Sequence, residues 1–338
     1  MIHLGLVGFG RLARDYYVPA LRRLPGARVI AVADPLEASR SAAAAALPGA
    51  ATFHGIDEVL AMRPDALLVA TPPSTHLAAW NAAQSAALPV FLEKPFVLAG
   101  QLSDALGGPE AQRRLMVNFN RHFWPPYQRL RALVAAGRVG RVRSATFTLH
   151  VDVLSWCDVT RHRLSPDDGG ALHDLGSQAL AVVPWLLGAE PVTIEVATAQ
   201  HRWPGDHVTL RLAFPDGEVA TCDLAYETRT FERVTIVGTT GRLRLQDPNM
   251  AVHVEAARDG RRRGLVRDVA VLGYRGLRRS RSMARFSIRA ALASFVQATR
   301  TRAPFVPGWD AAVRNVRGLE AALRAAQAGG AVRVEPLP

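Results

Sequence analysis

A glycine-rich turn near the N-terminus has the spacing that a nucleotide phosphate requires. The segment follows a short apolar run and matches G-x-G-x-x-G/A, with the residues Gly8, Phe9, Gly10, Arg11, Leu12 and Ala13. Gly8 permits a tight turn, Gly10 lets the backbone approach a pyrophosphate, and Ala13 is small enough for a helix to pack on a sheet. The pattern predicts a dinucleotide site at that helix's N-terminus; an ordinary glycine turn is the alternative.

An acidic residue follows at the distance that such a site needs. Asp34 ends the next apolar run, 24 residues beyond Gly10, which is close to the spacing of an acid that binds ribose hydroxyls. Because a carboxylate repels a 2′-phosphate, Asp34 favours NAD over NADP. Pro35 offers no positive charge to a phosphate, but Arg40 is near in sequence and leaves NADP open.

Lys94 is the second candidate for chemistry. The chain has 41 lysine and arginine residues, and Lys94 is the one lysine among them. Arginine stays protonated at any physiological pH, whereas a buried lysine can exchange a proton. Position 94 therefore keeps an amine either for chemistry or through chance retention of one codon.

Alternating strands and helices are predicted to position these residues. Five continuous apolar runs are expected to be strands: 4–7, 28–33, 66–70, 90–92 and 115–117. Amphipathic stretches such as 17–24 and 76–87 separate them. This alternation predicts βαβ units, with a parallel sheet that is covered on both faces. Residues 1–118 are therefore expected to form a Rossmann domain.

The hydrophobic period changes from about residue 119. Alternating runs at 145–151, 208–214, 219–224, 231–237 and 242–245 predict strands, and 215–218 is a turn between two of them. Helices are expected near 170–187, 286–299 and 311–328. Residues 119–338 are therefore expected to form an α+β domain with an open, mainly antiparallel sheet.

Four further segments carry a resemblance to a known family. They are 71–76 (TPPSTH), 93–95 (EKP), 117–123 (VNFNRHF) and 169–178 (GGALHDLGSQ). With the glycine turn, and in this order, they resemble the glucose–fructose oxidoreductase and inositol dehydrogenase (Gfo/Idh/MocA) family over nearly the whole chain. Glu-Lys-Pro together with the downstream Gly-Gly and Asp-x-Gly is a fairly specific combination.

The resemblance implies a cofactor site and a catalyst. Such enzymes bind NAD or NADP and a sugar, cyclitol or related polyol. The implied cofactor-contacting residues are Gly8, Phe9, Gly10, Arg11, Leu12, Asp34, Thr71, Pro72, His76, Glu93 and Lys94. Lys94 would lie beside the nicotinamide, where an ammonium polarises a carbonyl oxygen or holds a hydroxyl for deprotonation. A surface lysine after an edge strand is the alternative.

Asp174 matches the acid of the family's helix motif, but Gln178 stands where the family usually has a catalytic histidine. An amide donates and accepts hydrogen bonds but does not titrate near neutral pH. Three interpretations stay open. In the first, Lys94 or Asp174 carries the proton while Gln178 orients the substrate. In the second, another titratable group enters the site, and the candidates include His122, His150 and His162. In the third, the protein binds cofactor without ordinary turnover. His173 is expected to point elsewhere, because it is about 100° around the helix from Asp174.

Composition bounds the remaining possibilities. Hydrophobic residues make up 49% and charged residues 21%, which is the balance of a globular protein. The absence of a long apolar run argues against a membrane protein, and the N-terminus lacks a basic signal region. Two cysteines, Cys157 and Cys222, form no disulfide framework or zinc site, so we expect a cytoplasmic location and no metal.

The net charge is +12, and 11 arginines lie between Arg258 and Arg289. Either this stretch binds a phosphate-rich or acidic partner, or it is a solvated loop in an Arg-biased protein. Nucleic acid is an unlikely partner, because no aromatic residues interleave. Four tryptophans, at 156, 185, 203 and 309, could line a sugar site, although core packing is more common.

The sequence thus predicts an NAD(P)-dependent oxidoreductase that acts on a polyhydroxylated small molecule and forms a homodimer or homotetramer. The alternatives are a cofactor-binding sensor without turnover, and an epimerase or lyase that oxidises its substrate transiently.

Overall fold

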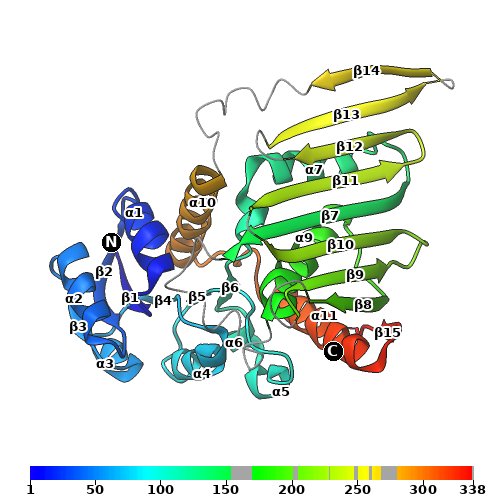
Figure 1. Ribbon diagram of the computed structural model, residues 1–338. Helices are drawn as coiled ribbons and strands as arrows, with labels where there is room; N and C mark the ends of the chain where they lie inside the picture. Colours follow the sequence, from blue (N-terminus) through cyan, green and yellow to red (C-terminus); the bar gives the residue numbers. More distant parts are fainter. Residues whose placement is uncertain are drawn as a thin grey trace. The chain divides into compact units, whose positions relative to one another are not determined.

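The chain forms two compact units (Figure 1). The computed structural model describes residues 1–153, 170–200, 205–227, 229–246, 250–258, 261–267 and 280–336, and side chains outside 256–283. The first unit consists of Met1–Asn120 and Ala284–Val316. The second unit consists of Arg121–Met283 and Arg317–Pro338.

A six-stranded parallel sheet forms the centre of the first unit, in the order β3-β2-β1-β4-β5-β6. Its strands are β1 (Ile2–Val7), β2 (Ala27–Ala33), β3 (Ala51–Phe53), β4 (Ala66–Val69), β5 (Val90–Leu92) and β6 (Leu115–Val117). Every residue of β4, β5 and β6 is buried, because helices cover both faces of a parallel sheet. The predicted Rossmann fold is confirmed. The short, half-buried β3 carries no continuous apolar run and was absent from the prediction.

Short helical elements connect these strands. They are the π-helical turn η1 (Ala13–Tyr17), α1 (Val18–Leu21), α2 (Glu37–Ala46), α3 (Ile56–Ala61), η2 (Pro73–Thr75), α4 (His76–Ser85), α5 (Leu102–Ala105) and α6 (Pro109–Gln112). Two later helices follow, α10 (Ser280–Thr301) and α11 (Trp309–Ala328).

A late segment of the chain completes the core of the first unit. On α10, Phe295 lies with its ring centroid 5.5 Å from that of Phe91 on β5. At the start of α11, Trp309 stacks on Trp80 at 6.0 Å. The compact units therefore differ from a simple division of the sequence at residue 118, because 284–316 returns to bury aromatic surface against the Rossmann sheet.

The second unit is built on a nine-stranded mixed sheet, in the order β14-β13-β12-β11-β7-β10-β9-β8-β15. Its strands are β7 (Val142–Asp152), β8 (Thr193–Ala199), β9 (His207–Ala213), β10 (Val219–Glu227), β11 (Phe231–Gly238), β12 (Gly241–Gln246), β13 (Ala251–Arg258), β14 (Arg261–Arg267) and β15 (Val332–Arg333). The pairing is antiparallel except between β7 and β10, which run parallel at the centre. The prediction of a mainly antiparallel sheet is confirmed, and so is the predicted turn at 215–218, which joins β9 to β10.

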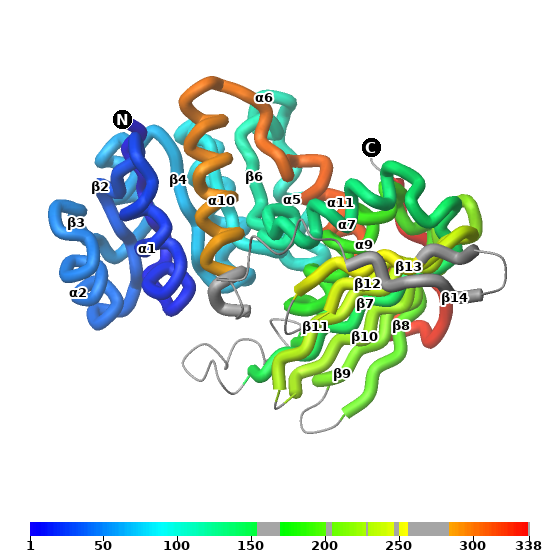
Figure 2. Tube along the Cα trace, turned by 90° about the horizontal axis from the view of Figure 1, so that it is seen from above, coloured from blue at the N-terminus to red at the C-terminus, as the bar shows by residue number. Residues whose placement is uncertain are grey.

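Helices cover one face of this sheet. Figure 2 shows α7 (Pro125–Ala135) and α9 (Ser177–Leu187) on the same side of the strands. Side chains that point to this side are buried, such as Phe147, Leu210 and Val234, whereas their neighbours Thr146 and Arg211 are exposed. The alternation follows from the period of two along a strand. The chain passes into this unit at the start of η3 (Asn120–Phe123), just before α7.

Candidate active site

The glycine turn has the backbone that a phosphate site needs. Gly8 has a φ of +89°, and a Cβ atom there would lie 2.7 Å from the carbonyl oxygen of Ala70. A Cβ atom on Gly10 would meet nothing within 4 Å. Gly8 is therefore required by the fold, whereas the absence of a side chain at Gly10 leaves space in front of the backbone. The turn then enters η1, where Ala13 is fully buried against the sheet.

Two other residues of the turn have defined positions. Arg11 forms an ion pair with Asp15, at 3.2 Å between Nε and Oδ2, and Leu12 is partly buried in the first helical turn. The structure thus places a guanidinium group at the start of η1, close to the N–H groups that a helix N-terminus offers to an anion.

Asp34 is tied directly to the glycine turn. Its Oδ2 accepts a hydrogen bond from the backbone N–H of Phe9 at 2.7 Å, and its Oδ1 accepts one from that of Leu36 at 2.9 Å. The carboxylate is buried, and each oxygen keeps a second lone pair for a ribose hydroxyl. The predicted acid and the predicted turn are therefore brought together.

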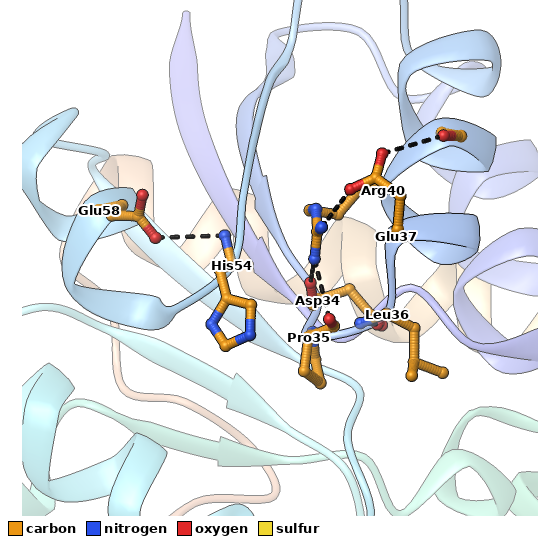
Figure 3. A network of polar contacts seen from close by, with 8 residues as sticks. Asp34, Pro35, Leu36, Glu37, Arg40, His54 and Glu58 are labelled. Carbon is orange, nitrogen blue, oxygen red and sulfur yellow. Dashed lines mark hydrogen bonds and ion pairs between the residues drawn. The ribbon is translucent and has the colours of Figure 1, made fainter.

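Arg40 lies next to Asp34 (Figure 3). Its Nη1 donates to the carbonyl oxygens of Asp34 and Pro35, both at 2.9 Å, and its Nη2 pairs with Glu37. The guanidinium group is thus fixed beside the acid that favours NAD, and Glu37 offsets its charge. Figure 3 also shows His54, whose backbone N–H donates a hydrogen bond to the carboxylate of Glu58 at 3.2 Å.

Thr71 and Pro72 lie where β4 ends, beside the glycine turn. The Cγ2 atom of Thr71 would be 2.8 Å from a Cβ on Gly8. The Thr75 hydroxyl oxygen lies 2.9 Å from Pro72 O and 2.8 Å from Thr71 Oγ1; it donates to the carbonyl oxygen and can accept from the Thr71 hydroxyl, which holds the segment in a compact turn. Because β1 and β4 are parallel neighbours, their carboxyl ends meet at one edge of the sheet.

His76 lies in the interior of the first unit, next to the Thr71 turn. Its side chain is fully buried, and its ring nitrogens face the carbonyl oxygens of Pro95 at 2.8 Å and Thr71 at 3.0 Å. Burial lowers the pKa of His76, and the nearby Lys94 charge lowers it further. The His76 ring therefore lies between the Thr71 turn and the loop that carries Lys94.

Glu93 and Lys94 follow β5 at the same edge. The carboxylate of Glu93 accepts hydrogen bonds from Tyr17 Oη and Asn118 Nδ2, both at 2.6 Å. Burial raises the pKa of Glu93, whereas these two donors and Lys94 lower it. Lys94 is partly exposed. The carboxylate of Glu93 and the amine of Lys94 therefore follow β5 at the same edge of the sheet as the glycine turn and Thr71.

Asp174 and Gln178 stand out on an otherwise buried helical segment of the second unit. The segment begins with the π-helical turn η6 (Leu172–Gly176) and continues as α9. From 171 to 184, these two are the residues that are not buried. Asp174 Oδ2 accepts a hydrogen bond from Tyr226 Oη at 3.2 Å. π-helical turns are frequent at functional sites, and the two partly exposed positions lie one helical turn apart.

Gln178 contacts a buried ionic network that the sequence did not indicate. Arg121 donates from Nη1 to Gln178 Oε1, and forms a paired contact with Glu232 at 2.9 and 2.8 Å. Tyr127 also donates to Glu232. Glu232 lies 111 residues from Arg121 in the chain, so no local sequence pattern connects them. The one available signal was the charge of Glu232 itself, at a position of the alternating run β11 whose side chain faces the helix-covered side of the sheet.

Several other candidate residues have structural partners. His122 stacks on Trp185 at 4.3 Å, and its Nε2 lies 2.9 Å from Ala181 O. His150 pairs with Asp223 on the open face of the sheet at 3.0 Å. His173 is buried. Trp185 and Trp309 pack against other rings. Trp156, Cys157, His162, Gly169 and Trp203 lie outside the described residues, as do most side chains of the arginine-rich stretch 258–289.

The first unit fits a dinucleotide. The open space at Gly10, the buried acid at Asp34 and the helix that begins directly after the glycine turn are the features that a pyrophosphate and a ribose need. Among the described residues, no group of three or more His, Cys, Asp or Glu side chains is placed to hold a metal. In the same part of the chain, no helix has the length and apolar character needed to cross a membrane.

Comparison with known proteins agrees with this assignment. Residues 2–118 match a family model described as "Oxidoreductase family, NAD-binding Rossmann fold", and residues 127–244 match the "GFO/IDH/MocA C-terminal domain". The cofactor of the first unit is therefore NAD.

Two relatives illustrate the sequence similarity. Inositol 2-dehydrogenase of Corynebacterium glutamicum is 31% identical over 201 residues, which are 58% of this chain and 57% of the relative. The rhizopine catabolism protein MocA of Rhizobium meliloti is 30% identical over 226 residues, 66% of this chain and 67% of the relative. The aligned part thus spans little more than half the length of the first relative.

Solved structures show the same fold over nearly the whole chain. An oxidoreductase domain protein from Kribbella flavida superposes with a TM-score of 0.85 at 20% identity, covering 99% of both chains. An oxidoreductase from Agrobacterium radiobacter, solved with NAD+, L-tartaric acid and magnesium, gives 0.82 at 18% identity and 98% coverage of both. With the two family models and the relatives, these findings show that the chain belongs to the Gfo/Idh/MocA family of oxidoreductases.

Proposed function

We propose that this protein is an NAD-dependent dehydrogenase that acts on a CH–OH group of a sugar, cyclitol or related polyol. The observation that carries the proposal is the position of Lys94 after β5, at the edge of the sheet that also holds the glycine turn. The relatives named inositol 2-dehydrogenase support a cyclitol or sugar as the substrate class. NAD, when bound, supplies the hydride acceptor or donor.

Lys94 has the chemistry for the polar part of this reaction. An ammonium group hydrogen-bonded to the substrate oxygen stabilises negative charge on that oxygen, whichever direction the reaction takes. Glu93 lies next to Lys94 and is fixed by Tyr17 and Asn118, so the loop has a defined shape. His76 ties the same loop to Thr71. In this proposal, Lys94 acts as the catalyst and its neighbours position it.

Asp174 is the proposed second polar group. Its carboxylate is partly exposed and accepts a hydrogen bond from Tyr226, which keeps the carboxylate in one orientation. A carboxylate at this place accepts a hydrogen bond from a substrate hydroxyl. Because Gln178 does not titrate, proton transfer falls to Lys94 or Asp174 in this chain.

The test is a substrate panel with matched variants. Purified protein is mixed with NAD and with each of several polyols, including myo-inositol and scyllo-inositol, and absorbance of the reduced cofactor is followed. The proposal predicts reduction with at least one polyol. Lys94→Ala should lower turnover by about 10²–10⁴-fold. Arg113→Ala, which removes an exposed positive charge directly after α6, is the matched control.

Two outcomes would contradict the proposal. Undiminished turnover of Lys94→Ala would remove its catalytic role. Tight NADH binding without a redox change for any polyol would instead indicate a cofactor-dependent sensor. A cytoplasmic location and a homodimer or homotetramer stay predictions from the sequence.

A further inference from the structure

The side chain of Gln178 is held on one side by a group that can only donate hydrogen bonds. Arg121 directs Nη1 at Gln178 Oε1, and a guanidinium group has five donors and no acceptor. The oxygen and nitrogen of a glutamine amide are often hard to distinguish by shape alone. Here the chemistry decides, because the reverse orientation would set N–H groups against N–H groups.

The amide nitrogen therefore faces away from Arg121. Gln178 Nε2 lies 3.5 Å from the carbonyl oxygen of Asp174, which is at the outer limit of a hydrogen bond. Gln178 is also one of the two partly exposed residues on the buried segment 171–184. Its NH2 group thus keeps donor capacity on the partly exposed part of this segment, which also carries Asp174.

We propose that Arg121 is a positioning residue that fixes Gln178 as a permanent hydrogen-bond donor to a substrate oxygen. The proposal rests on the proposed function, since it assigns a role within that site. It differs from base catalysis at this position, because the amide neither accepts a proton nor presents its oxygen to the substrate. Asp174 and Gln178 then form an acceptor and a donor side by side, suited to two neighbouring oxygens of a polyol.

The network behind Arg121 makes this orientation stiff. Arg121 is 8% exposed and Glu232 is 4% exposed, and both oxygens of the carboxylate accept from the guanidinium group. Tyr127 donates a further hydrogen bond to Glu232, and Trp124 lies with its ring centroid 5.2 Å from Arg121 Cζ. Because two hydrogen bonds join the guanidinium group to one carboxylate, the Arg121 side chain has little freedom to rotate. The pKa of Arg121 is raised, since the contact with Glu232 outweighs the effect of burial.

The first test needs no substrate. In Gln178→His, the ring nitrogen that faces Arg121 must stay unprotonated to accept its hydrogen bond. The introduced histidine should therefore titrate clearly below the ordinary value of about 6.5, as measured by NMR of the imidazole nitrogens. In the matched variant Gln178→His/Arg121→Met/Glu232→Gln, which removes both charges together, the pKa should return toward that value. A pKa at or above about 6.5 in the first variant would overturn the proposal, whether or not the triple variant folds.

The second test separates a donor from an acceptor by kinetics. Gln178→Glu has nearly the same shape but offers acceptors only, whereas Gln178→Met offers neither. If Gln178 donates, Gln178→Glu should lower kcat/KM by roughly tenfold or more, and at least as much as Gln178→Met. Retained activity in Gln178→Glu, with loss in Gln178→Met, would show that the oxygen faces the substrate and would overturn the proposal.

The two tests also distinguish this proposal from the proposed function. If the wild type oxidises no polyol, the proposed function fails, and the NMR titration still decides the orientation at position 178. If the wild type is active but the introduced histidine titrates normally, the function stands and the role of Arg121 is wrong.

Discussion

Glu37→Gln should increase the affinity for NADPH without changing the affinity for NADH. Arg40 is anchored by two carbonyl oxygens, of Asp34 and Pro35, so its guanidinium group should stay in place when Glu37 loses its charge (Figure 3). The positive charge beside the ribose-binding acid is then no longer offset. A 2′-phosphate gains from this charge, whereas the neutral 2′-hydroxyl of NADH does not.

The expected gain in NADPH affinity follows from the exposure of the Glu37 and Arg40 side chains to solvent. The side chain of Glu37 is 75% exposed and that of Arg40 is 19% exposed. Because solvent screens the two charges, the interaction energy of such an exposed ion pair is about 1 kcal/mol or less. Removing the competition from Glu37 should therefore strengthen NADPH binding by up to about fivefold. Asp34 still repels the phosphate, so NADH should remain the tighter ligand.

The assay is a titration of tryptophan fluorescence with NADH and with NADPH at two salt concentrations. The gain for NADPH should shrink at high salt, because exposed charges are screened. Glu110→Gln is a close control, since Glu110 is 73% exposed and pairs with Arg113 at the same i,i+3 spacing on α6. The reasoning is refuted if Glu37→Gln and Glu110→Gln have the same NADPH affinity.

Three further predictions concern stability. Gly8→Ala should destabilise the fold by more than about 1 kcal/mol, because its φ is +89° and a Cβ would contact Ala70 O; thermal melting measures it, and a wild-type melting temperature would contradict it. Glu232→Gln leaves the buried Arg121 charge unpaired and should cost about 3–5 kcal/mol in urea unfolding, whereas a loss below about 1 kcal/mol would mean that the pair is solvated. Burial lowers the pKa of His122 to about 4, below about 6.5 in an unfolded chain. Since the unfolded state then binds the proton more readily, the free energy of unfolding should fall by roughly 3 kcal/mol between pH 6.5 and 4. In His122→Gln this pH dependence should be smaller; equal profiles would rule out His122 as its source.

Much of the first unit could be predicted from the sequence because its signals are local. Continuous apolar runs marked five of the six strands, and the glycine turn and Asp34 have a fixed spacing. The structure adds their direct connection, the hydrogen bond from Phe9 N–H to Asp34. β3 escaped prediction because three half-buried residues carry too little hydrophobic signal.

The features that were missed depend on distant parts of the chain. The parallel pairing of β7 with β10 leaves no trace in the period of either strand, because alternation is the same in both directions. The return of Phe295 to the Rossmann sheet and the contact of Arg121 with Glu232 arise only when segments far apart in sequence meet. Gln178 was noticed as a departure from the family, but its orientation required the position of Arg121.

The most direct test of the account is an NADH titration of the wild type and of Gly10→Ala. A Cβ at Gly10 meets no protein atom within 4 Å, so this variant should fold normally and block only the approach of the pyrophosphate. We predict tight, saturable NADH binding by the wild type and a large loss of affinity in Gly10→Ala, with unchanged melting temperatures in the absence of cofactor. No binding by the wild type at millimolar NADH, or equal affinity in both proteins, would contradict it.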